Sequence, residues 1–313
     1  MRRAFVFPGQ GSQVVGMGHA IATTFPAARA MYQLADEALG WSVSELCFNG
    51  PEAQLTATDN TQPALVATSL AVLAAMAGDV NAITTYTTSN AVAVAGHSLG
   101  EYSALAAAGS LTPTDAIRLV RRRGELMAAA TSGGMAAVIG LDDDIIDRVC
   151  AEVSTLDDTV VVANYNSPGQ TVISGASAAL ARASEALKTA GAKRVLPLNV
   201  SAAFHSPLMR DAAHALTDAT DTTTMAVPRL PVISNITATP LASVAAIRSE
   251  LPAQVVSPVR WVSTIQYLVN NGVTQFVEIG AGEVLKNLIK RIAPDAVTHS
   301  IKDVASLEAF LAS

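Results

Sequence analysis

The stretch that decides the fold is Ala91-Val92-Ala93-Val94-Ala95-Gly96-His97-Ser98-Leu99-Gly100. Its apolar first half has no polar face, which is typical of a central strand in a parallel sheet that helices cover on both sides. A Gly-x-Ser-x-Gly pattern follows directly, and an alanine-rich helix is predicted from about Leu99 to Ala108. This order is typical of the strained strand-to-helix turn that exposes a nucleophilic serine. We therefore predict such a turn at Ser98, with an ordinary glycine-rich connection as the alternative.

Strands and helices alternate on either side of this turn. The predicted strands are Ala4–Phe7, Pro231–Asn235 and Gln275–Ile279, and the predicted helices are Ala27–Leu39, Pro63–Ala77, Thr114–Ala130, Met209–Ala219 and Glu283–Ile292, the last of which closes the fold. Alternation of this kind predicts an α/β domain with a parallel sheet.

The order of elements changes after Ser132-Gly133-Gly134. The predicted elements are strands at Met135–Ile139, Val160–Asn164, Thr171–Ser174 and Arg194–Leu196, and helices at Asp143–Val153 and Ala176–Ala190. Their β-α-β-β-α-β order is ferredoxin-like. We therefore expect a catalytic domain of residues 1–130 and 198–313, interrupted by a ferredoxin-like subdomain at residues 131–197.

Composition and charge exclude several classes of protein. The 20 Lys and Arg against 26 Asp and Glu give a net charge of −6, which argues against a nucleic-acid-binding protein. Cys47 and Cys150 form no disulfide framework and no metal-type pair, which fits a reducing cytoplasm. The longest apolar stretch, Ala64–Gly78, is shorter than the roughly 20 residues of a membrane span, and no signal peptide is predicted. We expect a cytoplasmic monomer without metal, tightly held cofactor, membrane or nucleic-acid partner.

A serine hydroxyl becomes a good nucleophile only when a base takes its proton. Among the five histidines, His205 is the candidate base, because it lies in an irregular loop at 201–207 that follows a predicted strand. A purely structural role for His205 is the alternative. His97 adjoins the serine, but successive residues at such a turn usually point in different directions.

Two further features could assist a nucleophilic serine. The glycine-rich loop Pro8–Gln13 can direct main-chain N–H groups at an anion, so the N–H groups of Gln10 and Leu99 could form an oxyanion hole. An ordinary β-α turn is the alternative for this loop. Arg123 shares the apolar side of its predicted helix, so its charge must be paired or functional. Its spacing allows either a structural ion pair or a bidentate contact with a substrate carboxylate.

Several segments, in one order along the chain, resemble the malonyl-CoA:acyl carrier protein transacylases. They are Phe7–Gln13, Thr61–Ala64, Gly96–Tyr102, Arg123–Met127, Asn164–Gln170, Ala203–Ser206 and Ser257–Trp261. The resemblance implies an α/β-hydrolase-like core with an inserted ferredoxin-like subdomain. It also implies an enzyme that transfers the malonyl group of malonyl-CoA to the phosphopantetheine thiol of acyl carrier protein. The reaction would run through a malonyl-serine intermediate in a ping-pong scheme and supply fatty acid synthesis.

The same resemblance assigns roles to individual positions. It makes Ser98 the nucleophile and His205 its base, with the main-chain carbonyl of Gln254 orienting the histidine. The remaining positions are Gln10 and Leu99 for the oxyanion hole, Arg123 for the free malonyl carboxylate, His97 as a second group near that carboxylate, and Phe204 as the bulky residue typical of malonyl rather than methylmalonyl enzymes.

The carrier protein of this family is acidic, so docking on a negatively charged chain needs a local basic surface. The candidate clusters are Lys286, Lys290 and Arg291 on the last predicted helix, and Lys188, Lys193 and Arg194 in the predicted subdomain. Either cluster could instead be an ordinary solvated face.

Other functions remain open from the residues alone. A plain serine hydrolase would use the same turn and the same histidine, and a domain that only holds a carrier protein is a third class. Among transferases, the transacylase of a malonate decarboxylase and a discrete polyketide acyltransferase would share these site residues.

Overall fold

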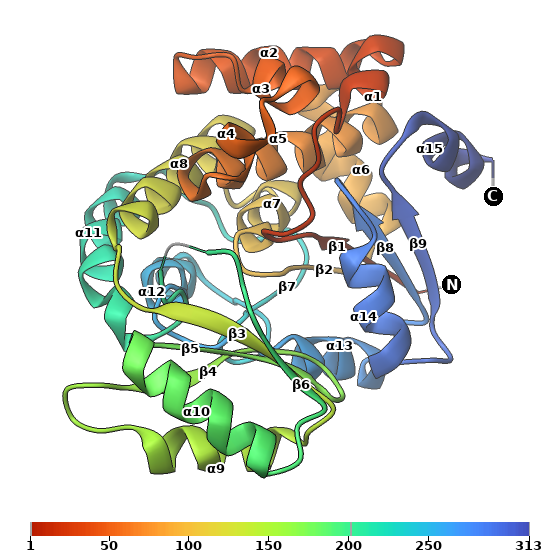
Figure 1. Cartoon of the computed structure of the whole chain (residues 1–313). Helices are drawn as coiled ribbons and strands as arrows, with labels where there is room; N and C mark the ends of the chain where they lie inside the picture. The colour runs from red at the N-terminus through yellow and green to blue at the C-terminus, as the bar shows by residue number, and fades with distance from the viewer. Residues whose placement is uncertain (1, 201, 313) are drawn as a thin grey trace.

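The computed structural model describes residues 2–200 and 202–312, which form a parallel sheet and a smaller antiparallel sheet. Within this range the parallel sheet has five strands in the order β7-β2-β1-β8-β9. The strands are β1 (Arg3–Phe7), β2 (Ala93–Gly96), β7 (Val232–Ile233), β8 (Gln275–Ile279) and β9 (Val297–Ile301). The predicted α/β class is confirmed, and β2, which leads into the serine turn, is an interior strand (Figure 1).

Helices cover both faces of this sheet because side chains alternate along its strands. In β1, Phe5 and Phe7 pack into one core, whereas Ala4 and Val6 pack into a second core on the opposite face. The helices outside the small sheet are α1 (His19–Thr24), α2 (Pro26–Leu39), α3 (Val43–Asn49), α4 (Glu52–Thr56), α5 (Thr58–Ala77), α6 (Ile83–Asn90), α7 (Gly100–Ala107), α8 (Pro113–Ala129), α11 (Arg210–Thr222), α12 (Val244–Gln254), α13 (Trp261–Asn270), α14 (Val284–Ile292) and α15 (Val304–Leu311), with short 3-10 helices at Val80–Ala82 and Pro207–Met209.

The small antiparallel sheet has the predicted ferredoxin-like order. Its elements are β3 (Gly134–Ile139), α9 (Asp143–Val153), β4 (Val160–Ser167), β5 (Gln170–Gly175), α10 (Ser177–Thr189) and β6 (Arg194–Pro197), and its strands lie in the order β4-β5-β3-β6. The sheet is tied to the rest of the fold through Val259, whose N–H donates to the Ala163 carbonyl at 2.8 Å and whose carbonyl accepts from the Tyr165 N–H at 3.0 Å. These bonds join the small sheet, drawn below the parallel sheet in Figure 1, to the segment that precedes α13.

Helix α5 differs from the prediction at its N-terminal end. It begins at Thr58 rather than at Pro63, although proline lacks the N–H that an interior helical position donates. The Asp59 carbonyl, which that N–H would have bonded, instead accepts a hydrogen bond of 2.9 Å from Nη1 of Arg121. A side chain from α8 therefore compensates for the proline and allows the helix to start earlier.

Helix α5 is longer than the apolar stretch Ala64–Gly78, so the prediction that this region is too short to span a membrane has to be corrected. It has 20 residues and is the one helix in residues 2–200 and 202–312 that is long and apolar enough to cross a membrane. However, 89% of its most apolar window is buried inside the protein. Burial on all sides is typical of a core helix.

The C-terminal part of the fold also departs from the prediction. Helix α14 does not close the fold, because β9 and α15 follow it. Only Ile301 of β9 is buried, so the strand lacks the hydrophobic pattern that would identify it in the sequence. The predicted strand Pro231–Asn235 is reduced to β7, because the Asn235 N–H donates to the Glu101 carboxyl group at 3.0 Å instead of to a neighbouring strand.

Candidate active site

Ser98 lies at the turn between β2 and α7, with a left-handed φ of 53°. Gly96 and Gly100 make this turn possible, because neither position has room for a side chain. A Cβ on Gly96 would lie 1.9 Å from the carbonyl carbon of Gly100, and a Cβ on Gly100 would lie 2.2 Å from the carbonyl oxygen of Phe7. The sharp strand-to-helix turn expected from the sequence is therefore present, and Ser98 lines a cavity.

His205 lies next to the serine, and its hydrogen bonds define its tautomer. Its Nδ1 lies 2.9 Å from the Gln254 carbonyl and 3.1 Å from the Ser257 carbonyl, so Nδ1 carries the proton and donates. Its Nε2 is then free to accept from the hydroxyl of Ser98, whose Oγ is 2.8 Å away. Burial is the main cause that lowers the pKa of His205 to about 3, and the positive charge of Arg123 is the second. The hydrogen bond to the Gln254 carbonyl acts in the opposite direction and raises that pKa. The neutral imidazole is the form that can act as a base.

Arg123 extends from α8 to the same point and is 1% exposed. Its Nη1 donates to Oε1 of Gln62 at 2.7 Å, and its Nη2 donates to Oε1 of Gln254 at 2.9 Å and to Oγ of Ser98 at 3.0 Å. Within the described part of the chain, no carboxylate lies within salt-bridge distance of this guanidinium. Burial lowers the pKa of Arg123, whereas the nearby Tyr102 and Glu101 side chains raise it. Of the two alternatives, a direct structural ion pair is thus excluded.

The remaining predicted positions surround the serine. Gln10 and Leu99 both line the cavity, and in residues 2–200 and 202–312 neither main-chain N–H has a hydrogen-bond acceptor. The Nε2 atom of His97 lies 2.8 Å from Oδ1 of Asn166, and its ring meets Trp261 edge-on. Burial lowers the pKa of His97, whereas the hydrogen bond to Asn166 raises it. Its ring is therefore fixed as a neutral side chain beside the reacting position.

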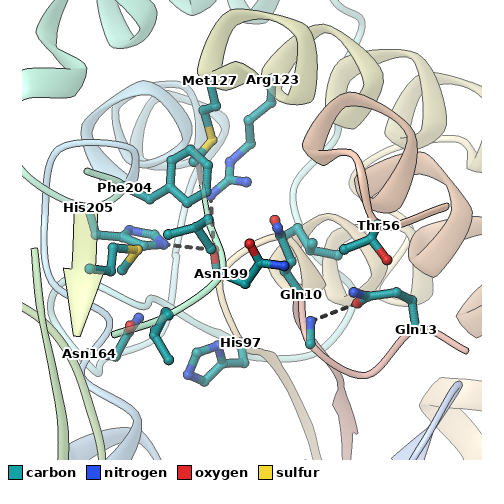
Figure 2. A pocket seen from close by; sticks show the side chains of 16 residues that line it. Gln10, Gln13, Thr56, His97, Arg123, Met127, Asn164, Asn199, Phe204 and His205 are labelled. Atoms are coloured by element: carbon teal, nitrogen blue, oxygen red, sulfur yellow. Dashed lines mark hydrogen bonds between the residues drawn. The ribbon is translucent and has the colours of Figure 1, made fainter. Parts of the chain in front are cut away.

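The cavity has a volume of about 300 Å³ and lies between the parallel sheet and the small sheet. Figure 2 shows Arg123, Met127 and Phe204 on one side and Gln10, Gln13 and Thr56 on the other. Its lining residues are Gln10, Gly11, Gln13, Thr56, His97, Ser98, Leu99, Arg123, Met127, Met135, Asn164, Leu198, Asn199, Val200, Phe204 and His205. No group of three or more His, Cys, Asp or Glu side chains that could hold a metal occurs in the described ranges.

Several residues behind the cavity were not predicted. Asn235 accepts a 2.7 Å hydrogen bond from the Ser98 N–H through Oδ1, and donates through Nδ2 to the Gly96 carbonyl at 2.7 Å. Glu101 and Gln62 lie within the segments Gly96–Tyr102 and Thr61–Ala64, but the sequence does not predict their side-chain contacts. Topology offered a signal for Asn235, because it follows a strand next to β2, and ligand sites of parallel sheets gather at the carboxyl ends of strands.

Comparison with known proteins agrees with this geometry. The acyl transferase domain family matches residues 4–307, and this match defines the class of the chain: it is an acyltransferase with an α/β core and a serine turn. Malonyl CoA-acyl carrier protein transacylase of Bacillus subtilis strain 168 is 44% identical over 97% of this chain and 95% of its own length.

Solved structures extend the comparison to the whole fold. The acyl-carrier-protein S-malonyltransferase of Bartonella henselae superposes with a TM-score of 0.94 at 42% identity, over 100% of this chain and 99% of that one. A malonyl-transacylase solved in complex with its type II PKS acyl-carrier protein superposes with a TM-score of 0.92 at 41% identity, over 100% of this chain and 99% of that one. The chain belongs to the malonyl-CoA:acyl carrier protein transacylase family, the [acyl-carrier-protein] S-malonyltransferases of fatty acid biosynthesis.

Proposed function

We propose that Ser98 carries the malonyl group during its transfer from malonyl-CoA to the phosphopantetheine thiol of acyl carrier protein. The observation that supports this most is the convergence of the His205 imidazole and the Arg123 guanidinium on one hydroxyl, at 2.8 Å and 3.0 Å from Oγ of Ser98. The imidazole can take the serine proton, and the guanidinium can bind a carboxylate through parallel hydrogen bonds. Malonyl is an acyl group that carries such a carboxylate at its far end.

The first half-reaction forms the ester. Nε2 of His205 takes the proton of Ser98 as Oγ attacks the thioester carbonyl carbon. The carbonyl oxygen becomes an oxyanion, which accepts hydrogen bonds from the main-chain N–H groups of Gln10 and Leu99. The carbon–sulfur bond then breaks, and His205 gives its proton to the departing CoA thiolate, which leaves a malonyl ester on Ser98.

The second half-reaction runs the same steps in reverse order with another thiol. His205 takes the proton of the phosphopantetheine thiol, the sulfur attacks the ester carbonyl carbon, and the serine oxygen leaves and regains a proton from His205. The Gln254 carbonyl, 2.9 Å from Nδ1, keeps the same imidazole nitrogen facing the serine throughout. This carbonyl occupies the place that a carboxylate takes in a serine-histidine-acid triad.

Intact-protein mass spectrometry after incubation with malonyl-CoA tests this proposal. The wild-type chain is expected to gain one malonyl group, which acyl carrier protein then removes, and Ser98→Ala is expected to gain none. Rapid release of free malonate without accumulation of the acyl-enzyme would instead indicate a serine hydrolase. Labelling that persists in Ser98→Ala would contradict the proposed nucleophile.

We propose that acyl carrier protein docks where α14 meets the small sheet. Nη1 of Arg291 donates to Oε1 of Gln170 at 3.0 Å, and the Lys193 side chain covers Gly140, where an added Cβ would lie 2.6 Å from Cδ of Lys193. Gln170 pairs with Ile139, the neighbour of Gly140. One member of each predicted basic cluster, Arg291 and Lys193, therefore lies near the same end of the small sheet.

The other members of these clusters differ in their availability. Lys290 and Arg194 are exposed, whereas Lys286 pairs with Glu283 at 3.5 Å and Lys188 pairs with Glu185 at 2.7 Å. We therefore place Lys193, Arg194, Lys290 and Arg291 at the centre of the docking surface, because an acidic partner need not displace a resident carboxylate from them.

Charge reversal tests the docking surface. Arg291→Glu and Lys193→Glu are expected to raise KM for acyl carrier protein and to leave loading from malonyl-CoA unchanged. Arg148→Glu on α9, whose side chain is exposed and near Glu152, is the matched control. An equal decrease in loading and transfer would contradict the docking assignment.

We also propose that the enzyme works as a cytoplasmic monomer. Every group in the proposed mechanism comes from one chain, and Cys47 and Cys150 are free and buried, as a reducing compartment allows. Light scattering of the purified enzyme tests the monomer, and a dimer under assay conditions would contradict it.

A further inference from the structure

Glu101 lies directly behind the active site and takes no part in the chemistry proposed above. It is a residue of α7 and is 0% exposed. One carboxyl oxygen, Oε1, accepts hydrogen bonds from N and Nδ2 of Asn235 at 3.0 and 3.1 Å. The other, Oε2, accepts from Nε2 of Gln254. Both oxygens therefore act as acceptors for groups that also contact the site.

These contacts determine which end of the Gln254 amide faces Arg123. Nε2 of Gln254 donates to Glu101 and to the carbonyl of Ser98, the latter at 3.1 Å. Its Oε1 is therefore left to accept from Nη2 of Arg123 at 2.9 Å. A guanidinium has donors only, so the amide can hold it through the oxygen and would repel it through the NH₂ group.

The carboxyl group of Glu101 shares its surroundings with a second buried acid. Burial, and next the charge of Glu250, raise the pKa of Glu101, whereas hydrogen bonds from Asn235 and Gln254 lower it. Both oxygens accept from amide donors in the structure, Oε1 from Asn235 and Oε2 from Gln254. Replacing one oxygen by NH₂ would therefore set a donor against a donor, which a buried site cannot compensate with water.

We propose that Glu101 is a positioning residue for malonyl selectivity, because it fixes the Gln254 amide that holds the Arg123 guanidinium beside Ser98. This inference rests on the proposed role of Arg123 in binding the malonyl carboxylate. It separates the two functions of Gln254, since the main-chain carbonyl orients His205 whatever the direction of the side-chain amide.

The first test is Glu101→Gln, assayed for kcat/KM with malonyl-CoA and with acetyl-CoA. Its amide nitrogen would face Nε2 of Gln254 and turn that amide around, so that NH₂ meets Arg123. The ratio of malonyl to acetyl kcat/KM is expected to fall at least about tenfold, the effect of losing one hydrogen bond to a charged group. The position of the acid limb of the acetyl reaction is expected to change little, because the main-chain bond to His205 remains.

The exchange Glu101→Gln/Gln254→Glu keeps the test valid if the single variant does not fold. The new amide oxygen at position 101 can accept from Asn235 while the amide nitrogen donates to the new carboxylate at position 254, so every donor regains an acceptor. That carboxylate would bind Arg123 directly and compete with malonyl. The double variant is therefore expected to recover the wild-type melting temperature but not the preference for malonyl.

Two outcomes would overturn the inference: equal losses of malonyl and acetyl transfer in the single variant, or wild-type selectivity in the double variant. Arg123→Ala is assayed in parallel. If Arg123→Ala loses selectivity and the Glu101 variants do not, only the positioning role is wrong. If Arg123→Ala retains selectivity, the proposed function of Arg123 is wrong as well.

Discussion

Nη2 of Arg123 lies 3.0 Å from Oγ of Ser98, so the guanidinium touches the atom that would carry the acyl group. An acyl group esterified to that oxygen would place a carboxylate two carbons away within reach of the same guanidinium. The bond to Ser98 must then be exchanged for bonds to substrate, while Gln62 keeps its hold on Nη1 at 2.7 Å. This proximity makes the preference for malonyl over acetyl directly testable.

Arg123→Ala is expected to lower kcat/KM for malonyl-CoA by about a hundredfold, the loss of two hydrogen bonds to a charged group. Transfer of acetyl, which has no carboxylate, is expected to be unchanged or faster. Arg122→Ala is the matched control, because that neighbouring side chain is exposed and interacts with Glu125. An unchanged malonyl-to-acetyl ratio in Arg123→Ala would reject the carboxylate-binding role.

The pH dependence of loading should follow the low pKa of His205. Because burial and Arg123 lower that pKa to about 3, the imidazole stays neutral at pH 5, and acyl-enzyme formation should show no acid limb near 6.5. Arg123→Ala removes a positive charge near His205 and should move the acid limb to higher pH. Stopped-flow loading from acetyl-CoA, which does not need the guanidinium, measures both limbs; a wild-type limb near 6.5 would contradict the assignment.

The same pKa has a consequence for stability. A folded-state pKa below the unfolded value means that folding favours the neutral imidazole, so this contribution is fully present above about pH 6.5. It is lost as the pH falls from about 6.5 towards about 3, where the unfolded chain binds a proton that the folded chain excludes. His205→Asn should therefore flatten the fall in the free energy of unfolding between pH 6.5 and 4.5, as urea titrations can measure. An equally steep fall in wild type and variant would show that other groups account for it.

Gly100→Ala should damage both the fold and the reaction. The added Cβ would lie 2.2 Å from the Phe7 carbonyl oxygen, so β1 or α7 must shift, at a cost of about 1–3 kcal/mol or more in the free energy of unfolding. Gly134→Ala is the matched control, since its Cβ would meet Leu180 at an ordinary 3.4 Å. Denaturant unfolding with parallel loading assays tests this; equal effects of the two substitutions would contradict the steric argument.

Phe204 should limit the size of the acyl group. It is 5% exposed and lines the cavity beside Met127, so Phe204→Ser opens space next to the substrate. The preference for malonyl-CoA over methylmalonyl-CoA should fall by about 10-fold or more, the range that one methyl group contributes in an apolar pocket. Competition assays with both substrates measure this ratio, and an unchanged ratio would assign size selection to another residue.

Local patterns in the sequence predicted much of this fold, because buried strands and amphipathic helices carry clear hydrophobic patterns. The apolar strand before Ser98 is present as β2, although it begins at Ala93 rather than at Ala91, and the bounds Asp143–Val153 of α9 agree with the structure. Strand β9 could not be predicted, because an edge strand with only Ile301 buried has no clear alternation. Helix α5 was predicted too short, because the interaction that compensates for Pro63 comes from Arg121 on another helix.

The site residues divide in the same way. Residues in short motifs, such as Ser98 and Arg123, could be found because the chemistry requires particular residue types at a turn or on a buried helix face. Short motifs assign no role to Asn235 or Gln62, because both reach the site through contacts between elements far apart in the chain. Such contacts are properties of the three-dimensional fold and leave no pattern at short spacing.

The Val259 hydrogen bonds that join the sheets also bear on protein engineering. Met135 and Asn164 belong to the small sheet, whereas Ser98 and Arg123 lie outside it, so a chimaera that exchanges only β3 to β6 would graft one wall of the cavity onto an unchanged reaction centre. The main-chain hydrogen bonds to Val259 need no particular side chain, whereas Asn166 and Gln170 must be kept in the graft because they bond His97 and Arg291. Recombination at this boundary therefore offers a route to altered acyl preference without rebuilding the nucleophile and its base.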